Sequence, residues 1–194
     1  MLFRSTALAD FDEATRIYAR ARMRAGAHAL PVLHRAVEQL RPSIVLSLGQ
    51  AAGRTGLTVE RVAINVADAR MPDNEGAQPI DEAVVPGAEA AHFASLPIKT
   101  MVAAIEAEGI PASVSQTAGT FVCNHVFYGL MHHLRAWPDA RGGFLHLPLL
   151  PEQVRADAPA PSLPLARMVA GVRAALAAAL GTHADARLAG GTEH

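Results

Sequence analysis

Along almost the whole chain, short apolar runs alternate with segments whose apolar residues recur at helical spacing, and this alternation constrains the fold most strongly. We expect strands over residues 43–49, 60–67, 112–116 and 144–150, and helices over residues 31–40, 96–109, 123–134 and 165–180. Such an order is typical of an α/β domain with an open, twisted, mainly parallel sheet and helices on both faces.

Amino-acid composition and charge indicate which kinds of partner and location this protein has. The sequence is 51% hydrophobic and 18% charged, with a formal net charge of -1, so it can bury a substantial core. The near-neutral charge argues against a nucleic-acid partner, and no apolar segment approaches the roughly 20 residues that cross a bilayer. The first residues are acidic where a signal peptide needs an apolar core. We therefore predict a cytoplasmic protein without nucleic-acid or membrane partners.

The sequence holds a single cysteine, Cys123, which excludes an intramolecular disulfide. It follows the turn TAG and begins the predicted helix 123–134. The amides and the positive dipole at a helix N-terminus stabilise a thiolate, which is the reactive form of cysteine. Cys123 is therefore a candidate nucleophile, while an inert core thiol and a metal ligand remain alternatives.

His146 lies inside the otherwise apolar strand 144–150, where an ionisable ring needs a hydrogen-bonding partner. Reactive residues of doubly wound sheets gather at the carboxyl ends of the strands, so His146 and Cys123 are candidates for one site. A hydrogen-bonded histidine of the core is the alternative that the pattern leaves open.

Two acidic residues are candidates for the group that orients this histidine. Glu60 lies at a strand start, and Asp73 lies in the polar segment 71–89. A carboxylate beside an imidazole fixes its orientation and favours its charged form, as in catalytic triads. Surface solvation is the alternative for both, and it is the expected state of Glu75 and Glu82.

Metal and nucleotide sites find little support in the sequence. His125, His132 and His133 lie on or near one predicted helix, but neighbouring helical residues point about 100° apart, and no His, Cys or Glu spacing matches a zinc motif. The segment LGQAAGR has neither the G-x-G-x-x-G order nor a P-loop lysine. We therefore predict no metal and no other cofactor.

Five longer motifs follow one another in the chain: GQAAGR, ERVAINVADARMPDNEGAQP, LPIKTMV, SQTAGTFVCNHVFYGLMHHL and RGGFLHLPLLPEQ. In sequence, order and spacing they resemble the type I pyroglutamyl peptidases, also known as pyrrolidone-carboxylate peptidases, over roughly residues 31–180. The resemblance implies a cytoplasmic cysteine peptidase that removes the N-terminal pyroglutamyl residue from peptides through an acyl-enzyme. It also implies an α/β/α sandwich of the phosphorylase/hydrolase-like kind, assembled as a homodimer or homotetramer.

The resemblance further implies roles for individual residues. The nucleophile of the family falls on Cys123, its general base on His146 and its triad acid on Glu60, with Asp73 in the matched PDN motif as a rival for the acid. The oxyanion contacts fall on the Cys123 amide and on Arg70. The other pocket residues of the family fall on Gln50, Met71, Phe121 and Val122.

The chain departs from the family pattern at its N-terminus. The family opens with a core strand, a Gly-Phe-(Asp or Glu)-Pro-Phe-Gly motif that helps wall the lactam pocket, and an Asn-Pro-Ser helix start, none of which the sequence contains. We expect residues 1–28 to form a polar, helical lead-in instead of that first strand, and residues 29–194 to form the peptidase-like domain.

This departure leads to the hypothesis that the reading frame is a fragment of a longer gene. It also leaves two functions open: an active omega-peptidase, or a truncated, non-catalytic relative that acts as an oligomer subunit.

Overall fold

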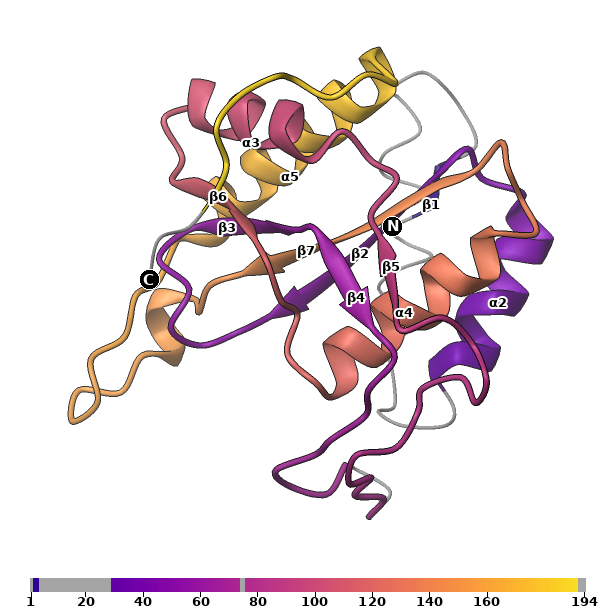
Figure 1. Ribbon diagram of the computed structural model, residues 1–194. Helices are drawn as coiled ribbons and strands as arrows, with labels where there is room; N and C mark the ends of the chain where they lie inside the picture. Colours follow the sequence, from indigo (N-terminus) through magenta and orange to yellow (C-terminus); the bar gives the residue numbers. More distant parts are fainter. Residues whose placement is uncertain (1, 4–28, 74–75, 192–194) are drawn as a thin grey trace. The chain divides into compact units, whose positions relative to one another are not determined.

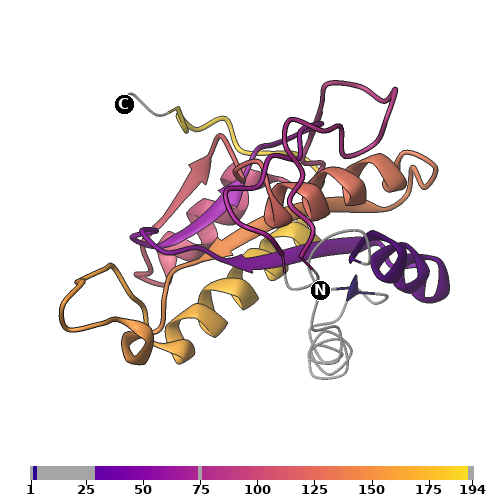
Figure 2. The same cartoon turned by 90° about the horizontal axis from the view of Figure 1, so that it is seen from below.

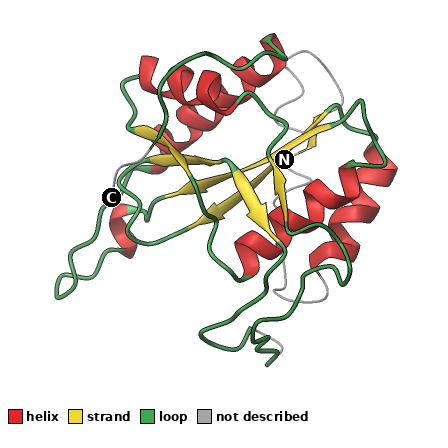
Figure 3. Cartoon of the chain, viewed as in Figure 1, coloured by secondary structure: helices red, strands yellow, loops and turns green. Residues whose placement is uncertain are grey.

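The computed structural model describes residues 2–3, 29–73 and 76–191. In chain order its elements are β1 (Leu2–Phe3), α2 (Ala29–Leu40), β2 (Ile44–Gln50), β3 (Leu57–Glu60), β4 (Val62–Ile64), β5 (Ala91–Phe93), α3 (Ile98–Ala107), β6 (Ala112–Ser115), α4 (Val122–Leu134), β7 (Arg141–Leu147), the 3₁₀ helix η3 (Pro151–Gln153) and α5 (Leu165–Gly181) (Figure 1). Helices and strands are interspersed along the chain, which confirms the predicted α/β class (Figure 3). Apart from β1, the lead-in expected over residues 1–28 lies outside the described residues.

The main difference from the predicted elements concerns the strand expected over residues 60–67. The structure splits it, because β3 ends at Glu60 and β4 begins at Val62. The two strands pair with different partners, β3 with β6 and β7, and β4 with β5. The apolar pattern runs through both strands, but the choice of partner depends on residues far away in the sequence.

The described chain divides into two compact units. Of the described residues, the first unit comprises residues 2–3, 29–47, 62–73, 76–95 and 117–143, and the second comprises residues 48–61, 96–116 and 144–191. The strands β2 and β7 contribute residues to both units.

In the first unit, α4 packs against α2 and against the antiparallel pair β4 and β5 (Figures 1 and 2). Three apolar residues of this helix, Val126, Leu130 and Leu134, are buried. Gly129 lies where α2 contacts α4, and a Cβ atom there would overlap the side chain of Leu30. A larger residue at position 129 would therefore require the Leu30 side chain to move.

In the second unit, β3 lies between β6, to which it is parallel, and β7, to which it is antiparallel. The helix α3 packs against β3, β6 and α5, and α3 and α5 lie side by side (Figure 1). Gly109 follows α3 with a φ of 66°, and its N–H and that of Ile110 bond the carbonyls of Glu106 and Ile105. This Schellman motif confirms the predicted helix end at Gly109.

None of the helices in the described part of the chain combines the length and the apolar character that a bilayer crossing requires.

Candidate active site

Glu60 and His146 form a buried, hydrogen-bonded pair in the second unit. Nδ1 of His146 lies 2.7 Å from Oε1 of Glu60, and the two side chains are 3% and 0% exposed. The strands that carry them are antiparallel neighbours, with His146 of β7 opposite Thr58 of β3. A carboxylate at Nδ1 fixes the tautomer of the ring and leaves Nε2 for proton transfer. This contact favours Glu60 as the orienting acid.

Arg54 holds the same carboxylate from the turn that follows β2. Its Nη2 atom lies 3.2 Å from Oε1 of Glu60, and its Nη1 atom donates a hydrogen bond of 3.1 Å to Oγ of Ser115. Ser115 of β6 is directly opposite Glu60 of β3. A buried carboxylate is costly unless it is paired. Arg54 therefore supplies a positive charge to the fully buried Glu60.

Cys123 is the second residue of α4 and is half-buried. The first turn of this helix contains no acidic residue, and the N-cap residue Phe121 provides no side-chain hydrogen bond to it. The first-turn amides thus keep their positive potential. The predicted position of Cys123 in the first turn of a helix is confirmed.

The residue after the cysteine, Asn124, fastens the start of α4 to the segment around β4. Its amide nitrogen donates to the carbonyls of Ile64 and Val66, both at 2.9 Å, and its oxygen accepts from the N–H of Ile64 at 2.9 Å. The side chain is buried, so no water replaces these bonds readily. Asn124 therefore fixes the helix turn that carries Cys123.

A cavity of about 260 Å³ lies beside the N-terminus of α4 in the first unit. It is somewhat smaller than the roughly 300 to 1,000 Å³ typical of sites for drug-sized ligands, which suits a small, single-ring group. Burial lowers the pKa of His125, so its ring is neutral at pH 7 and can both donate and accept a hydrogen bond. The lining residues are Ala67, Asp73, Ala77, Gln78, Pro79, Glu82, Ala83, Phe121 and His125.

The other residues expected in the site have varied surroundings. Gln50 ends β2 in the second unit, and its amide nitrogen donates to Oε1 of Gln153 at 2.7 Å and to the carbonyl of Pro148 at 3.2 Å. Arg70 and Met71 are exposed, and Val122 is half-buried. The structure brings Glu60 and His146 together, whereas six expected residues belong to the first unit: Arg70, Met71, Asp73, Phe121, Val122 and Cys123.

Asp73, the rival for the orienting acid, forms a local turn. Its Oδ1 atom accepts a hydrogen bond of 3.0 Å from the N–H of Ala77, and its own N–H donates to the Ala77 carbonyl at 2.9 Å. These contacts hold Asp73 and Ala77 together at one side of the cavity.

Comparison with known proteins decides the family. The sequence profile of the pyroglutamyl peptidases matches residues 10–182 of this chain. The chain belongs to the pyroglutamyl peptidase family. It is 58% identical to the pyrrolidone-carboxylate peptidase of Cupriavidus necator over 168 residues, which cover 86% of this chain and 78% of that protein. It is 55% identical to the enzyme of the same name from an Enterobacter species over 166 residues, again 86% and 78% of the two chains.

Solved structures of pyroglutamyl peptidases share the fold. Pyroglutamyl peptidase I from Bacillus amyloliquefaciens matches with a TM-score of 0.83 and 46% identity, over 86% of this chain and 79% of that one. The pyrrolidone carboxyl peptidase from Thermococcus litoralis matches with a TM-score of 0.76 and 36% identity, over 79% and 72% of the two chains. The predicted resemblance to this family is confirmed.

The sequence did not predict the structural roles of two residues of this pyroglutamyl peptidase family member, Arg54 and Asn124. Arg54 lies in the matched motif GQAAGR and Asn124 in the matched motif SQTAGTFVCNHVFYGLMHHL, but neither was predicted to belong to the site. An amide side chain directly after the candidate nucleophile, in the first turn of a predicted helix, is the pattern that points to Asn124. For Arg54 the sequence contains no comparable pattern, because its partners Glu60 and Ser115 come from other strands.

Proposed function

We propose that this member of the pyroglutamyl peptidase family is a cysteine omega-peptidase, which hydrolyses the bond after an N-terminal pyroglutamyl residue. The observation that carries the proposal is the buried pair of Glu60 and His146 in a chain whose single cysteine begins a helix. An imidazole oriented by an anion and a thiol at a helix N-terminus are the two groups that thiol hydrolysis requires.

The proposed reaction begins when the thiolate of Cys123 attacks the pyroglutamyl carbonyl carbon and forms a carbon–sulfur bond. The Cys123 amide and Arg70 stabilise the oxyanion. The carbon–nitrogen bond then breaks, and His146 gives a proton to the leaving amine. In the second half, His146 takes a proton from water as the water oxygen attacks the acyl-enzyme, the carbon–sulfur bond breaks, and pyroglutamic acid leaves with the Cys123 thiolate and the protonated His146 restored. Glu60 keeps the ring in the required tautomer throughout.

The substrate group has no charged amine, so its recognition calls for an apolar surface with a few hydrogen-bonding groups rather than for an acidic amine site. The cavity beside α4 offers an apolar surface, the ring of Phe121, and hydrogen-bonding groups, the carboxylates of Asp73 and Glu82 and the imidazole of His125. We assign Phe121, Val122, Met71 and Gln50 to lactam recognition on the strength of the family motifs.

The finer expectations from the resemblance belong to the same proposal. They are a cytoplasmic location and a homodimer or homotetramer in solution. Light scattering after size-exclusion chromatography measures the number of subunits.

Turnover of a pyroglutamyl-coumarin amide tests the proposal. The wild-type chain is expected to release coumarin, whereas it leaves the corresponding glutaminyl amide intact because that substrate lacks the lactam. Cys123→Ser and His146→Asn are expected to abolish turnover, while His183→Asn, which changes an exposed histidine, retains it. A folded wild-type chain without turnover favours the alternative, a non-catalytic subunit. Equal turnover by Cys123→Ser contradicts the assigned nucleophile.

A further inference from the structure

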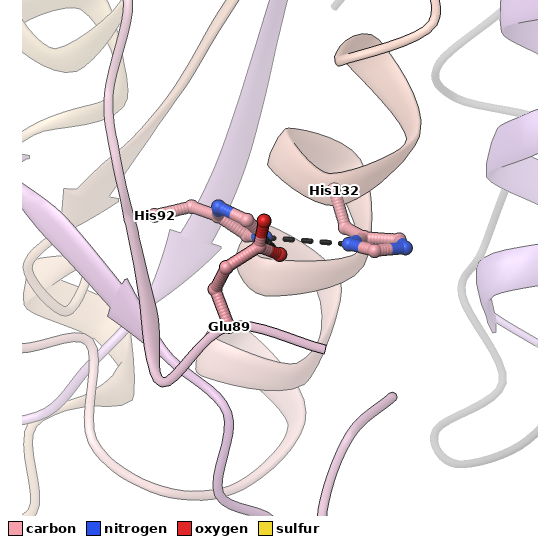
Figure 4. Close-up of side chains that lie close together, drawn as sticks. All are labelled: Glu89, His92 and His132. Atoms are coloured by element: carbon pink, nitrogen blue, oxygen red, sulfur yellow. Dashed lines mark hydrogen bonds and ion pairs between the residues drawn. The ribbon is translucent and has the colours of Figure 1, made fainter. Parts of the chain in front are cut away.

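Three side chains of types that commonly bind metal ions lie close together in the first unit. They have no role in the proposed peptidase reaction. They are Glu89, His92 and His132, and one ligand atom from each lies within 4.8 Å of the others. Figure 4 shows His92 and His132 pointing toward each other, from β5 and from the last turn of α4, with the carboxylate of Glu89 beside them.

The distances between these atoms match a zinc site closely. Nε2 of His92 lies 3.3 Å from Nδ1 of His132. Two imidazole nitrogens that each bind a tetrahedral zinc ion at about 2.0 to 2.1 Å are about 3.3 to 3.4 Å apart. Oε2 of Glu89 lies 3.9 Å from Nε2 of His92, about 0.5 Å more than the separation of two ligand atoms on a tetrahedral zinc ion.

The surrounding fold holds the three residues in place. The hydroxyl of the buried Tyr128, one turn before His132 on α4, donates a hydrogen bond of 2.5 Å to the carbonyl of Glu89. His92 is fixed through the pairing of β5 with β4, opposite Ala63, and its ring lies 4.7 Å from that of Tyr128. The two histidines are therefore presented by backbone segments that are already anchored to each other.

One charged neighbour, Arg135, bears on the carboxylate of this cluster. Arg135 forms an ion pair with Oε1 of Glu89, and this contact turns the other oxygen, Oε2, toward His92. The Arg135 guanidinium repels a cation, but it pairs with Oε1 of Glu89, and the cation would bind the other oxygen, Oε2.

We propose that Glu89, His92 and His132 bind one zinc ion, with water as a fourth ligand on the exposed side. Two imidazoles and one carboxylate favour zinc or a similar transition metal over magnesium and calcium, which prefer oxygen ligands. The ion links the segment before β5 to the C-terminal turn of α4. Its role is to stabilise the first unit, and it takes no part in peptide hydrolysis.

Calorimetric titration of the full chain with zinc chloride tests the proposal. The parent protein carries Cys123→Ser, which removes the thiol as a competing ligand, and has no histidine tag. One zinc ion per chain is expected to bind and to raise the melting temperature. His92→Gln and His132→Gln are each expected to lower the zinc affinity about tenfold or more. Glu89→Gln, a change at an exposed side chain that preserves folding, is expected to lower it as well.

His133→Gln is the matched control, because His133 is the sequence neighbour of His132 but stacks on His34, with ring centroids 4.1 Å apart. This variant is expected to retain the zinc affinity of the parent. The proposal is overturned if the parent binds no zinc, or if the three ligand substitutions leave the affinity unchanged. It is equally overturned if His133→Gln alone weakens binding, since that result assigns the ion to the other histidine pair.

Discussion

Arg54 and His146 contact the same atom, Oε1 of Glu60, at 3.2 Å and 2.7 Å. The second oxygen of this carboxylate, Oε2, is buried and has no hydrogen-bonding partner among the described residues. One oxygen thus connects a guanidinium to an imidazole that has almost no exposed surface. The three side chains behave as one coupled group, so substitutions within it are expected to be non-additive.

Replacing the acid is expected to damage the reaction severely. Glu60→Gln removes the anion that fixes the tautomer of His146, and in the serine peptidase template the corresponding change lowers kcat about 10⁴-fold. We expect a loss of at least about 100-fold in kcat for pyroglutamyl-coumarin amide. Asp73→Asn is the matched control, because its carboxylate serves a local turn, and it is expected to change kcat far less. The reverse order of the two effects assigns the orienting role to Asp73.

The guanidinium is expected to act through the acid rather than on the substrate. Arg54→Met keeps the aliphatic stem but removes the hydrogen bonds to Glu60 and Ser115, and a bond to a charged group contributes about 1.5 to 3 kcal/mol to stability. We predict a lower melting temperature and a lower kcat with an unchanged KM. Arg167→Met, which removes an exposed hydrogen bond to the Gly109 carbonyl, is the control and is expected to affect neither kinetic constant. A rise in KM alone for Arg54→Met assigns it to substrate binding instead.

Asn124 is expected to matter for stability as well as for activity. Asn124→Ala removes three hydrogen bonds and leaves a partly buried N–H and two carbonyls without their partner, at a cost of about 1 kcal/mol or more for each. We predict destabilisation by about 3 kcal/mol or more in urea unfolding, and a lower kcat. Gln39→Ala, at an exposed amide of α2, is the control and is expected to be near neutral. A near-neutral Asn124→Ala shows that the start of α4 is held by other contacts.

Local patterns in the sequence predicted the elements whose boundaries are set locally. The helix α3 and its end at Gly109 follow from helical spacing and from a glycine that adopts a positive φ. The strand expected over 60–67 was wrong because nothing local distinguishes β3 from β4, which differ only in the distant strands they pair with.

The sites also divide into features that depend on nearby residues and features that depend on residues far apart in the sequence. Cys123 was recognised from its place at a helix start, and the family motifs selected Glu60. Neither spacing nor composition brings His92 next to His132, since 40 positions separate them and only the packing of α4 beside β5 unites them. The contact of Arg54 with Glu60 likewise depends on the turn after β2, whose course the sequence pattern does not determine.

A second histidine pair in the first unit makes stability depend on pH. The rings of His34 and His133 are stacked, with an angle of 7° between their planes. Burial, and next the neighbouring His133, lower the pKa of His34 below its usual value of 6.5, while the Gly129 carbonyl and Glu38 partly oppose this shift. The folded chain therefore binds a proton at His34 less readily than the unfolded chain does.

The sign of the pH effect follows from this difference. Well above pH 6.5, the usual histidine pKa, neither state is protonated at His34 and the full stability is present. As the pH falls below that value, the unfolded chain takes up a proton that the folded chain resists, so the free energy of unfolding decreases. We predict that the melting temperature falls between about pH 7 and about pH 5. His34→Phe, which keeps an aromatic ring in the stack, is expected to flatten this dependence, whereas His183→Gln, at an exposed position, leaves it unchanged. An undiminished fall in the melting temperature of His34→Phe shows that other groups cause the acid sensitivity.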